Sequence, residues 1–75
     1  MDLQIARQLN DKIKVGFYTR AYLKQIINEI YTNLEIKAKG KATDITKWFD
    51  AEPNYKRVDG KVTKGYMIYR PLFSI

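Results

Sequence analysis

The clearest periodic pattern in the chain lies in the segment TRAYLKQIINEIYTNLEI. Its apolar residues recur three and four positions apart, at Leu23, Ile26, Ile27, Ile30, Tyr31 and Leu34. This spacing draws one apolar stripe along a helix, so the pattern predicts a helix from about Arg20 to Leu34. Thr19 is a suitable N-cap, because its hydroxyl can accept a hydrogen bond from a free backbone N–H. Core packing alone explains the stripe.

Two shorter patterns precede this helix. The apolar residues near the start recur at helical spacing and predict a short helix over residues 2–12; they are Leu3, Ile5, Ala6 and Leu9. The alternation in KIKVGFYT, residues 12–19, predicts a short extended segment. The first helix has two possible uses, which are to pair two protomers in a homodimer or to cover the core.

A basic turn and a further helix are expected next. The turn KAKGKA, residues 37–42, contains Gly40, which is free to adopt a positive φ. Apolar positions spaced as one helical face then follow, at Ile45, Trp48 and Phe49. They predict a second, shorter helix over residues 43–50, with Thr43 as its N-cap and an end before Pro53.

Residues 55–70 carry the signals of a β-hairpin. Asp59-Gly60 is a strong turn dipeptide, since both residues tolerate positive φ. A two-residue turn there mixes apolar with basic side chains on each face, whereas a wider loop over residues 59–65 places Val58 opposite Tyr66 on an apolar face. We favour the wider loop. Its exposed tip is expected to contain Lys61, Thr63 and Lys64.

The segments YTRAYLKQIINEIYTNLEI, KATDITKWF and VDGKVTKGYMI, which cover residues 17–68, together carry a family resemblance. The order of the expected elements resembles that of winged helix-turn-helix domains: a helix, a short strand, a long helix, a basic turn, a short helix and a charged hairpin. It resembles, more weakly, the small winged helices of phage and mobile-element proteins. The resemblance implies an α+β fold of about three helices and a C-terminal hairpin wing. A chain of 75 residues is expected to form it as one domain.

The positive charge is unevenly distributed along the chain. Residues 1–36 hold five basic and four acidic side chains, a net charge of +1, whereas residues 37–75 hold nine and four, a net charge of +5. Clustered positive potential concentrates polyanions, which favours a nucleic acid or another acidic molecule as the partner. Solubility is the competing explanation for a basic protein.

The resemblance also implies which residues touch DNA. Helix 43–50 would enter the major groove, and the wing over residues 59–65 would lie along the phosphates. The expected nucleic-acid contacts are Lys39, Lys41, Thr43, Thr46, Lys47, Arg57, Lys61 and Lys64. A solvated turn, or lysines that protect an edge strand from aggregation, explains the same cations without DNA.

Helix 43–50 departs from the family pattern as a reading helix. It has no Arg, Asn or Gln, the side chains that pair best with base edges, and its Asp44 and Asp50 repel phosphates. Gln25 and Asn28 on the long helix are alternative readers. We therefore expect binding that rests on about five to seven phosphate contacts and depends strongly on salt. The departures also leave a second function open, a phage-type inhibitor or adaptor that binds a host protein.

The aromatic residues have two competing uses. Tyr55, Tyr66 and Tyr69 flank the basic hairpin and could stack on unpaired bases. Packing of a small core is the alternative use of such large side chains.

Several function classes are disfavoured by what the chain lacks. It contains no cysteine and no histidine, which excludes disulfides, Cys/His zinc sites and imidazole chemistry. Its four glycines match no nucleotide-binding fingerprint, and Asp44 and Asp50 are too far apart on one helix to act as a carboxylate pair. We therefore expect neither an enzyme nor a cofactor. No apolar run approaches the ~20 residues that span a bilayer. We expect a cytoplasmic protein, associated with the nucleoid if it binds DNA.

Overall fold

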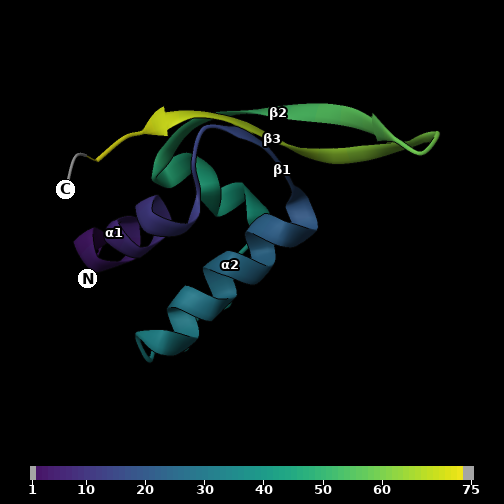
Figure 1. Ribbon diagram of the computed structural model, residues 1–75. Coiled ribbons are helices and arrows are strands. Elements are labelled where there is room, and N and C mark those ends of the chain that lie inside the picture. Colours follow the sequence, from purple (N-terminus) through teal and green to yellow (C-terminus); the bar gives the residue numbers. More distant parts are fainter. Residues whose placement is uncertain (1, 74–75) are drawn as a thin grey trace.

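Three helical segments lie against one face of a three-stranded antiparallel sheet in the computed structural model, which describes residues 2–73 (Figure 1). The elements are α1 (Asp2–Lys12), β1 (Gly16–Thr19), α2 (Arg20–Asn33), the 3₁₀ helix η1 (Ala42–Lys47), β2 (Phe49–Val58) and β3 (Lys61–Pro71). The predicted α+β class is confirmed. Within residues 2–73, every helix is too short or too polar to cross a membrane.

Both long helices form where their apolar periodicity predicts them. At the start of α2 the Thr19 hydroxyl accepts a hydrogen bond from the Tyr22 backbone N–H at 3.2 Å, as expected of an N-cap. At its end, Glu35 has a φ of 59°, a left-handed conformation that terminates the helix. The local sequence therefore determines both ends of α2.

The core fills the space between the helices and the sheet. Its largest fully buried side chains are Leu9, Ile13, Leu23, Ile27, Ile30, Ile45, Phe49 and Ile68. Helix α1 buries Ile5, Ala6 and Leu9, so its apolar face covers the core. Gly40 is buried for a packing reason, because a Cβ there would collide with the side chain of Ile27, and it does not adopt the positive φ that the turn composition allowed.

The sheet has the strand order β1-β3-β2. Tyr18 of β1 pairs with Tyr66 of β3, and a Cβ on the neighbouring Gly65 would meet the Tyr18 carbonyl oxygen. Glycine at position 65 thus permits the close approach of the two strands. The order of elements and strands is compatible with a winged-helix layout.

The predicted wide loop of the hairpin is wrong. Asp59 and Gly60 alone form the turn, with φ values of 51° and 80°, and Val58 pairs with Lys61. Positive φ at both central positions is the pattern of a type I′ turn, which matches the twist of the flanking strands. The mixed faces that argued against this register are tolerated because Val58 and Val62, 48% and 61% exposed, lie beyond the core.

The predicted helix over residues 43–50 is also wrong in type and extent. The segment is a 3₁₀ helix that ends at Lys47, and Phe49 already begins β2. The Asp44 carboxylate accepts a hydrogen bond from the Lys41 backbone N–H at 3.0 Å, so the helix begins before Thr43, the expected N-cap. Strand β2 continues through Pro53, which an edge strand accommodates because it needs no donor on its outer side.

Candidate nucleic-acid interface

Two adjacent hollows share the side chain of Arg20. One, of about 370 Å³, lies between the starts of α2 and η1. The other, of about 110 Å³, lies between Arg20 and the hairpin. Their basic lining residues are Arg20, Lys24, Lys41 and Lys64, and no carboxylate of the described residues lines either hollow. We call these two hollows together the basic groove.

The helical side of the basic groove is built from α2 and the loop before η1. Arg20 and Lys24 are four residues apart, so they occupy one side of the helix. Asn28 fixes the loop to α2, because its Oδ1 accepts a hydrogen bond from the Gly40 N–H at 2.9 Å and its Nδ2 donates one to the Gly40 carbonyl oxygen at 3.2 Å. This clamp places the next residue, Lys41, in the same hollow as Lys24.

The hairpin supplies the other side of the basic groove. Tyr55 and Lys64 are cross-strand partners, so their side chains project from the same face of the sheet. That face also carries Tyr66, which is only 6% exposed, and is therefore the face that packs on the helices. Figure 1 shows the hairpin extending beyond the start of α2, so its inner face overhangs the first turn of that helix.

The structure brings three of the predicted contact residues together. Lys41, Thr43 and Lys64 line the basic groove. Arg57 projects from the same hairpin face as Tyr55, since the two are separated by one residue along β2. These four positions come from three separate segments of the chain.

The other predicted contact residues lie elsewhere or have local partners. Lys61 pairs with Val58 and projects from the opposite hairpin face, and Lys39 lines neither hollow. The Thr46 hydroxyl donates to the Thr43 carbonyl oxygen at 2.9 Å. Lys47 lies 3.5 Å from the Asp44 carboxylate. η1 thus presents few free polar side chains.

Sequence reasoning missed Arg20 and Lys24. Both belong to the predicted long helix, where attention to the apolar stripe left the basic positions unassigned. The available signal was their spacing of four residues at the start of a helix that has no acid in its first turn. Their position opposite Lys41 and the hairpin follows only from the tertiary fold.

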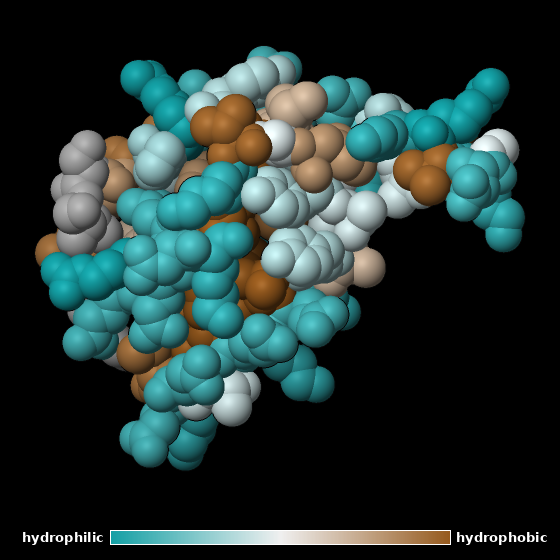
Figure 2. Space-filling model, viewed as in Figure 1, coloured by the Kyte–Doolittle hydropathy of each residue, from teal (hydrophilic) through white to brown (hydrophobic). Residues whose placement is uncertain are grey.

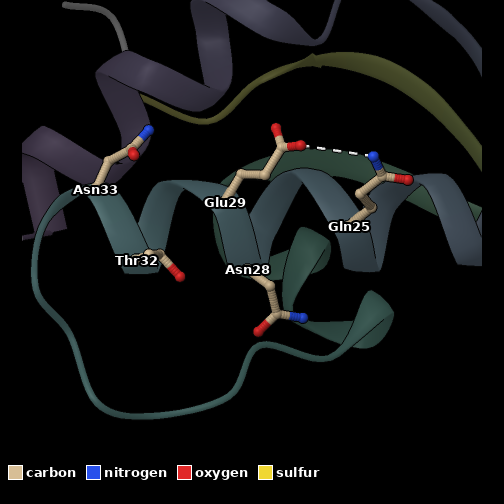
Figure 3. A pocket seen from close by; sticks show the side chains of 5 residues that line it. All are labelled: Gln25, Asn28, Glu29, Thr32 and Asn33. Carbon is tan, nitrogen blue, oxygen red and sulfur yellow. Dashed lines mark hydrogen bonds between the residues drawn. The ribbon is translucent and has the colours of Figure 1, made fainter.

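The alternative readers, Gln25 and Asn28, line a separate hollow of about 440 Å³ on α2 (Figure 3). Asn28 points toward the loop that it clamps, and the Gln25 Nε2 donates to Glu29 Oε1 at 3.5 Å. Glu29 also pairs with Lys12 at 3.9 Å. The Gln25 and Asn28 amides already form hydrogen bonds within the protein, and the Glu29 carboxylate repels phosphates. The hollow therefore suits DNA less well than the basic groove does.

The three hairpin tyrosines have different surroundings. Tyr66 is buried, and the Tyr69 hydroxyl donates to Glu52 Oε2 at 3.3 Å. Desolvation, together with the charge and hydrogen bond of Glu52 and the charge of Asp50, raises the pKa of Tyr69 above its ordinary value. Tyr55, by contrast, is exposed beside cations.

Comparison of the chain with protein-family models, with curated proteins and with solved structures found no match. The candidate site therefore rests on the geometry and the charges of this chain.

Proposed function

We propose that this protein is a nucleic-acid-binding module of the winged helix-turn-helix type, which holds duplex DNA against the basic groove and hairpin in transcription regulation or in phage or mobile-element replication. One observation carries the proposal. Cations from α2, from the loop before η1 and from the hairpin converge on one surface, and no carboxylate lines the hollows that they share.

Ion pairing within the protein does not account for this convergence. Among the side chains described, those of residues 3–73, the ion pairs are Lys12–Glu29, Lys47–Asp44 and Arg70–Asp50, and none involves a cation of the basic groove. Like charges gathered without partners repel one another, which costs free energy in the isolated protein. A polyanion that lies across them removes this repulsion and releases its own condensed counterions.

The chemistry of the groove supports recognition of the phosphate backbone more than of sequence. Lysine and arginine are donors to phosphate oxygens, and Thr43 adds a hydroxyl at the edge of the groove. η1 is too short, and its side chains too engaged, to supply the paired donors and acceptors that read base edges. We infer a modest sequence preference and strong electrostatic dependence.

The test is titration of a labelled blunt duplex by fluorescence anisotropy at several salt concentrations. With about five to seven phosphate contacts, the logarithm of the binding constant should fall linearly with the logarithm of salt, with a slope of about −4.5 to −6.3. Binding weaker than the ~10⁻⁴ M of nonspecific DNA-binding proteins, even at low salt, would contradict the proposal.

A second candidate function, a phage-type inhibitor or adaptor that binds a host protein, is favoured by the lack of free reading side chains on η1. A pull-down from nuclease-treated lysate distinguishes the two. A stoichiometric protein partner that is lost when Arg20, Lys24 and Lys41 are replaced by glutamine would favour this function, and DNA binding without such a partner would contradict it.

A further inference from the structure

Tyr55 is an exposed aromatic residue in the basic groove. Its side chain is 62% exposed and lines the smaller hollow together with Arg20 and Lys64. Arg57 lies two residues further along the same strand face, and the rise of an antiparallel strand places its Cα about 6.8 Å from that of Tyr55. An exposed aromatic residue thus shares a hollow with two cations, on the surface proposed to hold DNA.

Packing does not account for Tyr55, whereas it does account for other tyrosines of the chain. Tyr66 and Tyr31 belong to the core. Tyr18 and Tyr22 stack on each other, with ring centroids 5.6 Å apart. Tyr55 lies outside the buried cluster, on the hairpin face opposite Arg20 at the start of α2.

The smaller hollow has an apolar wall as well as a basic one. Pro53 shares the hairpin face with Tyr55, and Tyr66 is the cross-strand partner of Pro53. A flat, partly apolar base can therefore lie against the ring and the proline while its phosphate lies on a cation. Inside an intact duplex both faces of a base are covered by stacking, so such contact requires an unpaired base.

We propose that Tyr55 stacks on an unpaired base whose flanking phosphates contact Arg20 and Lys64. The preferred ligand of the basic groove is then a duplex with a single-stranded extension, as at a fork or a processed end. This inference rests on the proposed function, because it concerns the same surface, and it narrows the kind of DNA that this surface binds.

The experiment compares three labelled DNAs by fluorescence anisotropy. One is a blunt duplex, one carries a single-stranded extension, and one carries an abasic extension with the same number of phosphates. The protein should bind the base-bearing extension about tenfold more tightly than the abasic one, since stacking on an aromatic side chain distinguishes them and charge does not.

Three variants assign the preference to Tyr55. Tyr55→Ala should bring the ratio of the affinities for the base-bearing and abasic extensions to about one, and Tyr55→Phe should keep the ratio of the unmodified protein. Tyr69→Ala, a matched change on the carboxylate-rich face of the same hairpin, should leave the ratio unchanged. Lys64→Gln should weaken the binding of both extended DNAs by the same factor, because it removes a phosphate contact and leaves the Tyr55 ring in place.

The outcomes separate this inference from the proposed function. Salt-dependent binding with equal affinity for the base-bearing and abasic extensions overturns the stacking role and leaves duplex binding intact. A preference that survives in Tyr55→Ala assigns stacking to another residue and equally overturns the inference. No binding to any of the three DNAs overturns both proposals.

Discussion

At the scale of single residues, the position of Asn28 has the widest consequences. Its side-chain amide joins α2 to Gly40 by two hydrogen bonds, because it donates one to the Gly40 carbonyl oxygen and accepts one from the Gly40 N–H. A third hydrogen bond, from its Nδ2 to the Lys24 carbonyl oxygen at 2.9 Å, holds the amide in place. A residue that first suggested base reading therefore positions the loop that carries Lys41.

Asn28→Ala should lower the free energy of unfolding by about 1–3 kcal/mol, because the partly buried Gly40 backbone groups lose their partners. It should also weaken duplex binding, since Lys41 is no longer held beside Lys24. Urea denaturation and DNA anisotropy measure the two effects. Asn33→Ala, an exposed change on the same helix, is the control and should alter stability by less than about 0.5 kcal/mol. Equal behaviour of the two variants would refute the clamp.

At the scale of elements, the hairpin consists of two parts with different roles. Its root packs on the core through residues such as Phe49 and Ile68 and carries the acidic residues Asp50 and Glu52. Its outer part is exposed and basic, and Figure 2 shows it projecting from the body with hydrophilic and hydrophobic side chains at its end. The outer part therefore contributes little to stability and much to the positive surface.

Shortening the hairpin tests this division. Deletion of residues 57, 58, 61 and 62 removes two cross-strand pairs and leaves Asp59-Gly60 as a turn between Lys56 and Thr63. Because the deleted residues are exposed, the free energy of unfolding should change by less than about 1 kcal/mol. Loss of Arg57 should make the salt slope less negative by about 0.9. Unchanged DNA binding would show that the outer hairpin does not contact DNA, and a large loss of stability would contradict its structural independence.

At the scale of the whole molecule, the fold brings four basic side chains from three segments of the chain onto one surface. The basic groove lies where the start of α2 faces the hairpin, whereas α1 and the hairpin root lie toward the opposite end (Figure 1). A net charge of +6 would act equally from all sides if it were evenly spread. The grouping of four of the 14 basic residues in the basic groove predicts that DNA binding depends on which charges are removed.

The triple variant Arg20→Gln, Lys24→Gln, Lys41→Gln should therefore bind duplex DNA at least about tenfold more weakly at 0.1 M salt, with a slope less negative by about 2.7. A control with the same change of net charge replaces Arg7, Lys14 and Arg70 with glutamine, since these residues line neither hollow. The control loses the exposed Arg70–Asp50 pair and the exposed hydrogen bond from Lys14 Nζ to the Asn10 carbonyl oxygen, and such surface contacts contribute little to stability. Equal losses in the two triple variants would indicate a general charge effect and no groove.

Features that depend on interactions within one segment could be predicted from the sequence, whereas features that depend on contacts between distant segments could not. Helices over residues 2–12 and 20–33 were predictable because helical periodicity is read within the segment itself. The helix over residues 43–50 was not, because Phe49 is buried as part of a strand that pairs with β3. The hairpin was predictable as an element, but its register depended on whether its outer faces would be buried.

The same distinction applies to the candidate site. Lys41, Thr43 and Lys64 were predicted as contacts, and they lie in the basic groove. Arg20 and Lys24 were not predicted, because their neighbours in the groove are distant in sequence. Lys61 was placed with Lys64 on one tip, and the two-residue turn puts these side chains on opposite faces of the hairpin.

By itself, the sequence determined the two long helices, the turn dipeptide, the net positive charge and the absence of cysteine and histidine chemistry, since each depends on residues close together or on composition. Only the tertiary structure decided which cations face one another, which amide serves as a clamp and which tyrosine lies exposed in the basic groove. Those outcomes depend on contacts between segments far apart in the chain, and the burial of apolar surface sets such contacts only when the whole core assembles.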